Sequence, residues 1–226
     1  GRMSGADPVR VGVLDYRMSN LRSAVKALER LGAEVHVARA PGEIGRPDAL
    51  LLPGVGNFGE AARRIETSGL AGPVRESVAD GVPLLGICLG MQLLFEWSEE
   101  EPESRGLGIL PGGVRRLRTD AKVPHIGWSE VTWTPGVATA PPDGGPHART
   151  YYFVHSYACA PDAPEMVLGT AIHGTEFVAA VGHGRVTGVQ FHPEKSSDAG
   201  LGVLSRWLDA VRADRAAAPP AATADR

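Results

Sequence analysis

Cysteine, excess positive charge and long apolar runs are all scarce in this 226-residue sequence. With only Cys88 and Cys159, at most one disulfide can form, so the fold does not depend on a disulfide framework. The net charge of −3 lacks the basic excess of nucleic-acid-binding proteins, and no apolar run approaches the roughly 20 residues that span a bilayer. The N-terminus has no charged and apolar signal segment. We therefore expect a cytoplasmic protein that binds neither nucleic acid nor a membrane.

The spacing of apolar residues predicts an α/β fold. Buried strands and helices alternate in the first half, which favours a mainly parallel central sheet flanked by helices. We expect these strands at 9–16, 34–38, 49–52 and 83–87, and helices at 21–31, in segments of 58–80, and at 89–97. The second half predicts an antiparallel extension, with strands at 113–118, 129–134, 150–160, 176–182 and 185–191 before a final helix at 198–213.

The same pattern predicts one domain. A chain of this length has enough residues to bury a large core. The domain is expected over 9–213, after a small polar tail (1–8) and before an Ala/Pro-rich tail (214–226) that we expect to be disordered.

Cys88 lies where a predicted strand runs directly into a helix, in the segment Gly86-Ile87-Cys88-Leu89-Gly90. Glycines two residues to either side allow the sharp turn of a nucleophile elbow, which exposes the side chain at the sheet edge. The helix N-terminus also favours a thiolate over a thiol. A buried structural cysteine is the more common fate of a free thiol, but this context favours a nucleophile.

A nucleophilic cysteine needs a base, and His192 follows the last predicted strand in Phe191-His192-Pro193-Glu194. Pro193 favours extended backbone at His192, and residues two apart in extended chain point to the same side. His192 and Glu194 can therefore converge, with the imidazole moving the proton and the carboxylate orienting it. By itself a His-x-Glu pattern is weak, because surface histidines are common.

The turn after the strand at 49–52, Pro53-Gly54-Val55-Gly56, lies at the same predicted sheet edge. Gly54 and Gly56 allow backbone amides to approach a ligand, although such a segment alone is usually only a tight turn. We expect the backbone N–H groups of Leu89 and Val55 to bind an oxyanion formed during attack by Cys88. The sequence has no phosphate-binding P-loop and no paired Cys-x-x-Cys, so we expect no metal and no cofactor.

The segments Gly86-Ile87-Cys88-Leu89-Gly90-Met91-Gln92 and Val189-Gln190-Phe191-His192-Pro193-Glu194-Lys195-Ser196 resemble the class I, triad-type glutamine amidotransferases. This family hydrolyses glutamine to glutamate and ammonia through a cysteine thioester. The resemblance implies the class I glutamine amidotransferase fold, with Cys88 as nucleophile, His192 as general base and acid, and Glu194 as the orienting carboxylate.

Other segments are similar to one branch of the family, the glutaminase subunits of imidazole glycerol phosphate synthase in histidine biosynthesis. They are Asp15-Tyr16 with Asn20-Leu21-Arg22-Ser23, Val123-Pro124-His125-Ile126-Gly127-Trp128, and Tyr152-Phe153-Val154-His155-Ser156-Tyr157. The resemblance runs from about Val9 to Trp207. It implies a heterodimer with a HisF-type (β/α)₈ cyclase subunit, which receives the ammonia and forms imidazole glycerol phosphate and aminoimidazole carboxamide ribotide.

The resemblance also implies contacts with L-glutamine. Gln92 would contact the substrate, Glu100 suits its α-ammonium group, and the backbone of Ser156 and Tyr157 would receive its α-carboxylate. For Glu100 the alternative of a solvated acidic face stays open, because it lies in the run Glu99-Glu100-Glu101.

The residues expected at the cyclase interface are Asn20, His125, Trp128 and Lys195. Core packing of Trp128 and a loop role for His125 are alternatives. Arg17 and Ser19 depart from the family, which commonly has glycine at both positions, so the backbone of this loop is expected to differ. Cys159, Trp97, Trp133 and Trp207 are expected to pack in the core.

Two other interpretations remain at this stage. One is the glutaminase subunit of another synthase, such as anthranilate or carbamoyl-phosphate synthesis, which the Pro-His-Ile-Gly-Trp segment argues against. The other is a non-catalytic interaction module, which the presence of Cys88, His192 and Glu194 argues against.

Overall fold

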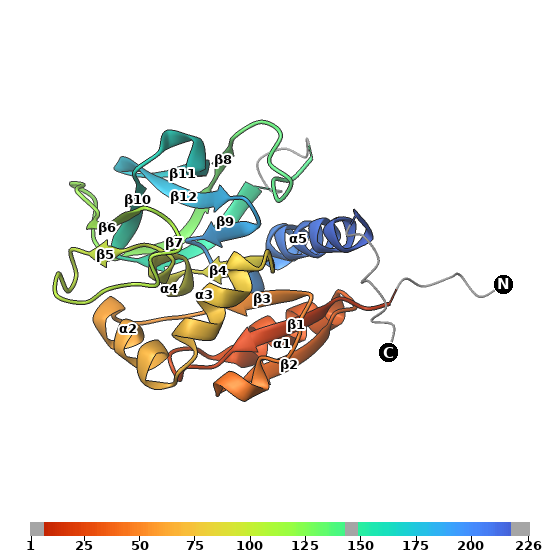
Figure 1. Cartoon of the computed structure of the whole chain (residues 1–226). Coiled ribbons are helices and arrows are strands. Elements are labelled where there is room, and N and C mark those ends of the chain that lie inside the picture. Colours follow the sequence, from red (N-terminus) through yellow and green to blue (C-terminus); the bar gives the residue numbers. More distant parts are fainter. Residues whose placement is uncertain (1–6, 143–148, 218–226) are drawn as a thin grey trace, which may run out of the picture.

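A computed structural model describes residues 7–142 and 149–217, and Figure 1 gives the arrangement of the elements. A large mixed sheet runs through the molecule in the order β2-β1-β3-β4-β13-β12-β10-β6-β5, with β11 beside β12 and β8 beside β11. The five strands at one end, from β2 to β13, pair in parallel. They are β1 (Arg10–Leu14), β2 (Glu34–Ala38), β3 (Ala49–Leu52), β4 (Leu84–Ile87) and β13 (Val186–Val189). The α/β class with a mainly parallel sheet is confirmed.

The predicted antiparallel extension follows β13. It contains β6 (Gly112–Arg116), β8 (Thr132–Trp133), β10 (Tyr157–Pro161), β11 (Val167–His173) and β12 (Thr175–His183), and the short β5 (Trp97–Ser98) adds to β6 in parallel. Two strands, β7 (His125–Glu130) and β9 (Thr150–His155), form a separate antiparallel sheet. The single strand predicted over 150–160 is therefore two strands in different sheets, divided at Ser156.

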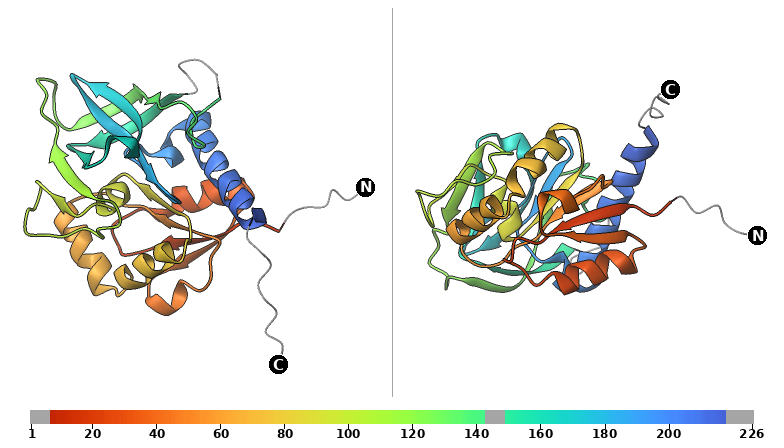
Figure 2. Two further views of the ribbon diagram at one scale, coloured as in Figure 1. Left: turned by 45° about the horizontal axis from the view of Figure 1, so that its top comes forward. Right: turned by 60° about the horizontal axis from the view of Figure 1, so that its bottom comes forward.

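Helices cover both faces of the sheet (Figures 1 and 2). They are α1 (Leu21–Arg30), α2 (Phe58–Thr67), α3 (Ala71–Ala79), α4 (Leu89–Leu93) and α5 (Ser197–Ala217), with 3-10 turns at Pro41–Glu43, Pro164–Met166 and Pro193–Lys195. The side chain of Asn20 caps α1 by accepting from the N–H of Arg22. Alternate residues of β3 enter opposite cores, since Leu51 belongs to the cluster that contains residues of α1 and α5, whereas Leu50 and Leu52 belong to the cluster that contains residues of α2 and α3.

Two predicted helix boundaries are wrong. The helix expected at 89–97 ends at Leu93, because Trp97 pairs with Gly113 and its ring fills the space where a Gly113 side chain would lie. The last helix continues to Ala217, so 214–217 belong to α5 and not to the predicted tail. The rest of that tail (218–226) and most of the N-terminal tail (1–6) lie outside the described residues.

The core contains most of the residues that we expected to pack. Cys159, Trp133 and Trp207 are all buried, and both cysteines are free thiols. Among the described residues, no helix combines the length and apolar character that crossing a membrane requires.

Candidate active site

Cys88 lies between β4 and α4 with a φ of +53° and a ψ of −111°. Residues other than glycine rarely adopt this backbone conformation, because it costs them on the order of 1–3 kcal/mol. Where it occurs, it is typical of functional turns. The flanking glycines make it possible. A Cβ at Gly86 would approach the carbonyl oxygen of Gly90 to 2.8 Å, and a Cβ at Gly90 would overlap the carbonyl oxygen of Leu52. The predicted elbow geometry is confirmed.

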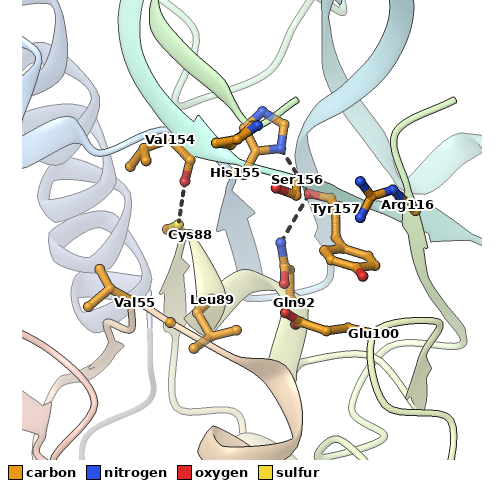
Figure 3. A pocket seen from close by; sticks show the side chains of 12 residues that line it. Val55, Cys88, Leu89, Gln92, Glu100, Arg116, Val154, His155, Ser156 and Tyr157 are labelled. Atoms are coloured by element: carbon orange, nitrogen blue, oxygen red, sulfur yellow. Dashed lines mark hydrogen bonds between the residues drawn. The ribbon is translucent and has the colours of Figure 1, made fainter. Parts of the chain in front are cut away.

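The turn places Cys88 at a pocket of about 460 Å³ (Figure 3). The lining residues are Val55, Gly56, Cys88, Leu89, Gln92, Glu100, Arg116, Pro124, Val154, His155, Ser156 and Tyr157. The Cys88 thiol is directed at the carbonyl oxygen of Val154, at 3.9 Å. This pocket therefore lies between the carboxyl ends of the parallel strands β3 and β4 and the antiparallel strands β6, β9 and β10.

His192 and Glu194 converge as the sequence predicts. Nδ1 of His192 lies 2.7 Å from Oε1 of Glu194, and both side chains are less than a tenth exposed. Burial alone lowers the pKa of His192, but the thiol of Cys88 and the carboxylate of Glu194 raise it to about 10. Because Glu194 occupies Nδ1, the buried Nε2 is the nitrogen left to exchange a proton with Cys88.

Ser196, which was not among the predicted site residues, fixes this arrangement. Its buried hydroxyl donates to the carbonyl oxygen of His192 at 2.6 Å and accepts from the N–H of Tyr152 at 2.9 Å. The N–H of His192 donates in turn to the carbonyl oxygen of Tyr152 at 3.0 Å. Strand β9 thus holds the backbone on both sides of the imidazole. The serine was visible in the quoted motif, but only the fold shows what it contacts.

The two N–H groups expected to bind the oxyanion are both occupied. The N–H of Leu89 donates to the carbonyl oxygen of Gly54 at 3.2 Å, and the N–H of Val55 donates to the carbonyl oxygen of Met18 at 2.7 Å. One peptide group, between Gly54 and Val55, therefore makes both contacts. In this structure the predicted oxyanion site is therefore closed by the loop itself.

The loop is also packed tightly. The hydroxyl of Tyr16 donates to the carbonyl oxygen of Pro53 at 2.6 Å, and a Cβ at Gly54 would overlap that hydroxyl. Gly56 has a φ of +108°, which glycine adopts readily. Both glycines are therefore required by the loop. Only Gly56 of the two lines the pocket.

Opposite charges line the wall away from the nucleophile, where Glu100 and Arg116 are both present (Figure 3). Oε2 of Glu100 accepts from the N–H of Phe58 at the start of α2, at 2.8 Å. This contact fixes Glu100 at the pocket, whereas the neighbouring Glu101 forms an ion pair with Arg63. Arg116 was not predicted. It lies outside every quoted motif, and its pairing on β6 opposite Tyr157 places it at the pocket.

The remaining predicted substrate residues also meet in the pocket. Ser156 lies just before β10 and Tyr157 begins it, and Nε2 of Gln92 donates to the carbonyl oxygen of Tyr157 at 3.1 Å. His155, which was not assigned a role, donates from Nδ1 to the same carbonyl at 2.8 Å. Burial lowers the pKa of His155 to about 3. This histidine is therefore neutral at pH 7.

Of the residues expected to face the cyclase, three are exposed. Trp128 is 53% exposed, and Asn20 and Lys195 also reach the surface. His125 is instead 3% exposed and stacks on His173, with its Nδ1 3.0 Å from Nε2 of His155. Burial lowers its pKa to about 4. The expectation that His125 lies on the partner-facing surface is wrong for this structure, because its strand pairs it inward with His155.

The loop between β1 and α1 contains Arg17 and Ser19, where the family commonly has glycine. Arg17 keeps a backbone conformation typical of glycine. Arg17 has a φ of +64°, and Arg64 donates to its carbonyl oxygen at 3.2 Å. Ser19 has a buried hydroxyl that makes no hydrogen bond within the described chain. The described residues contain no group of three or more His, Cys, Asp or Glu arranged to bind a metal ion.

The family model "Glutamine amidotransferase class-I" matches residues 12–208. The chain belongs to the class I glutamine amidotransferases. Within this family it groups with the imidazole glycerol phosphate synthase subunits HisH. The HisH subunit of Moorella thermoacetica is 47% identical over 203 residues, which cover 89% of this chain and 95% of that protein. The subunit of Methanopyrus kandleri is 45% identical over 202 residues, covering 88% and 98%.

Solved structures agree on the fold. PurLQS from Thermotoga maritima matches with a TM-score of 0.70 at 21% identity, over 91% of this chain and all of that one. A crystal structure of a glutamine amidotransferase matches with a TM-score of 0.69 at 23% identity, over 90% and 98%. The family model and the HisH relatives confirm the predicted family and its glutamine amidotransferase function, which argues against the non-catalytic module.

Proposed function

We propose that this amidotransferase hydrolyses L-glutamine with Cys88, His192 and Glu194 and delivers the ammonia to a separate cyclase subunit. The observation that carries the proposal is the buried His192–Glu194 pair, joined at 2.7 Å, whose imidazole pKa is raised by the thiol of Cys88. A histidine oriented by a carboxylate beside an elbow cysteine can take and return one proton.

The proton of Cys88 passes to Nε2 of His192, in keeping with the raised pKa of that imidazole, and the sulfur then attacks the side-chain amide carbon of glutamine. The tetrahedral intermediate then loses its C–N bond, and the amine leaves as ammonia with the proton from His192. A thioester to Cys88 remains. Water gives a proton to His192 and attacks this thioester, and cleavage of the C–S bond releases glutamate while the proton returns to sulfur.

The charges of the pocket suit an amino-acid zwitterion. We place the α-ammonium group at Glu100, which the N–H of Phe58 holds in the pocket. The α-carboxylate is placed at the backbone of Ser156 and Tyr157, with the guanidinium of Arg116 nearby in the same lining. Gln92 occupies the wall between them and the elbow. Opposite charges at one end orient the side-chain amide toward Cys88 at the other.

The loop Pro53–Gly56 is proposed to switch between two states. Rotation of the Gly54–Val55 peptide would release the N–H of Leu89 and turn the N–H of Val55 away from Met18. Both donors would then face the oxyanion, as attack on a carbonyl requires. This closed loop limits hydrolysis in the free subunit, so we expect the cyclase to stimulate the reaction.

The partner is proposed to be a HisF-type (β/α)₈ cyclase, in a heterodimer located in the cytoplasm. The relatives are named as subunits of imidazole glycerol phosphate synthase, and both thiols of this chain are free. The side chain of Trp128, 53% exposed on β7, gives this interface an apolar anchor. The exposed polar side chains of Asn20 and Lys195 are proposed as further contacts.

Glutamate release with and without the cyclase tests the assignment. Stimulation by the cyclase supports it, and equal rates would refute the subunit role. Trp128→Ala should weaken cyclase binding at least about tenfold, because exposed aromatic anchors carry much of an interface's energy. Arg46→Ala is the matched control, since Arg46 is exposed just before β3, at the end of that strand opposite Pro53.

A further inference from the structure

Gln190 is a buried polar residue to which neither the sequence motifs nor the proposed reaction assigns a role. It is fully buried between β13 and His192, and its N–H donates to the carbonyl oxygen of Ala179 at 2.9 Å. A buried amide side chain is costly unless its polar atoms find partners. Its contacts therefore indicate what the residue does.

Both ends of the Gln190 amide are engaged. Nε2 lies 3.7 Å from the sulfur of Cys88, and Oε1 accepts from Nε2 of Gln92 at 3.1 Å. The same nitrogen of Gln92 donates to the carbonyl oxygen of Tyr157 at 3.1 Å (Figure 3). These contacts form a continuous line from the backbone of β10 through two glutamine side chains to the nucleophile.

The direction of every hydrogen bond in this line is determined. The carbonyl oxygen of Tyr157 can only accept, so the atom of Gln92 beside it must be the amide nitrogen. The atom of Gln190 that faces this nitrogen must then be its oxygen. The amide nitrogen of Gln190 is consequently the atom that points at the sulfur of Cys88.

Two groups of opposite kind thus contact the sulfur. The carbonyl oxygen of Val154, at 3.9 Å, can only accept a hydrogen bond from the protonated thiol. The N–H of Gln190 can donate to the sulfur in either state, and such a bond is stronger to a thiolate. A donor held by buried partners needs no reorganisation when the charge develops.

We propose that Gln190 is a positioning residue for the nucleophile, which holds the sulfur of Cys88 toward the substrate and stabilises its ionised form by donating from Nε2. Gln92 keeps the Gln190 amide in the required orientation. The inference rests on the proposed role of Cys88 as nucleophile. It concerns how readily the thiol ionises, so the ionisation of Cys88 is the property to measure.

The experiment follows alkylation of Cys88 by iodoacetamide across pH, in the full chain bound to its cyclase. The Cys159→Ala background leaves Cys88 as the only thiol of this chain. Gln190→Glu keeps the size and the acceptor for Gln92 but removes the donor, and Gln190→Met removes both. We expect the alkylation midpoint to rise by at least about half a pH unit in Gln190→Met, because a hydrogen bond to the charged form is lost, and to rise further in Gln190→Glu, whose carboxylate also repels the thiolate.

Glutamine turnover in the same variants separates positioning from packing. We expect kcat to fall at least about tenfold while KM for glutamine changes less than about threefold, as when an interaction of the reacting group is lost. An unchanged alkylation midpoint in Gln190→Met would overturn the inference. It would leave the proposed function intact, because the nucleophilic role of Cys88 is tested separately by the turnover of Cys88→Ala.

A measurement on the unaltered side chain covers the case in which these variants do not fold. The side-chain amide resonance of Gln190 should shift with pH at the same midpoint as Cys88 alkylation, and this shift should vanish in Cys88→Ala. A resonance that does not respond to pH would also contradict the proposed contact.

Discussion

The N–H of Val55 donates to the carbonyl oxygen of Met18 at 2.7 Å, so the amide expected to bind the oxyanion is committed to the first loop. That loop contains Arg17 in a left-handed conformation, and Arg64 donates to the Arg17 carbonyl oxygen. The resting state of the predicted oxyanion site is thus held by a segment near the proposed partner-facing residue Asn20. If the partner binds at this loop as proposed, the Val55–Met18 hydrogen bond would link its binding to the oxyanion site.

The first prediction concerns the Gly54–Val55 peptide. In a complex with the cyclase and a bound glutamine analogue, we expect the Val55 N–H to leave Met18 and face the pocket. Hydrogen exchange of this amide should change between the free and complexed chains, because its hydrogen-bond partner changes. A complex structure with glutamine bound and the same Val55–Met18 contact would rule out the switch.

The second prediction concerns Glu194. Replacing it by Gln removes the carboxylate that helps raise the His192 pKa to about 10, so the pKa should fall. An imidazole NMR titration measures this. Since the folded pKa lies above the unfolded value of about 6.5, the stabilisation is fully present below pH 6.5 and is lost as pH rises toward 10. Glu194→Gln should flatten that loss in urea denaturation. An unaltered His192 titration would contradict the pairing.

The third prediction separates Glu100 from its acidic neighbours. Glu100→Gln should raise KM for glutamine at least about tenfold, because the α-ammonium group loses its charged partner. Glu101→Gln is the control, since Glu101 pairs with Arg63 and does not line the described pocket. Steady-state kinetics with the cyclase present measures both. Equal KM values for the two variants would show that Glu100 is only part of a solvated acidic face.

The fourth prediction follows from the buried histidines. The pKa values of His125 and His155 are lowered by burial to about 4 and about 3. Their pKa values in the folded protein lie below the value of about 6.5 in the unfolded chain. The free energy of unfolding is therefore unaffected by their titration above pH 6.5 and falls as the pH is lowered toward 3. Each contributes a slope of up to about 1.4 kcal/mol per pH unit in the free energy of unfolding. His125→Gln should reduce the measured slope between pH 6.5 and 4, and an identical slope would contradict its neutral state.

Sequence patterns predicted the elements that depend on local periodicity. The parallel strands, Cys88 between strand and helix, and the convergence of His192 with Glu194 all follow from spacings within a few residues. The break at Ser156 does not, because it arises where His155 pairs with His125 while Tyr157 pairs with Arg116. Likewise, Trp97 lies outside its predicted helix, where it pairs with Gly113 of the next strand, which leaves space for its ring.

Local sequence patterns also do not predict the features of the site that depend on long-range contacts. Nothing local distinguishes Glu100 from Glu99 and Glu101, and it is the N–H of Phe58 that selects it. The orientation of the Gly54–Val55 peptide depends on Met18 and Leu89 together. His125 lies in a segment typical of the subunit, yet the pairing of two strands turns it into the interior. In each case tertiary partners decide the outcome.

The central claim is that Cys88 is the nucleophile of a glutaminase that works with a cyclase, and glutamate release by Cys88→Ala in the presence of cyclase tests it most directly. Cys159→Ala is the matched control, because Cys159 is the only other thiol and is buried away from the pocket lining. We expect Cys159→Ala to release glutamate at close to the normal rate and Cys88→Ala to release none above background. Glutamate release by Cys88→Ala at the normal rate would contradict the account.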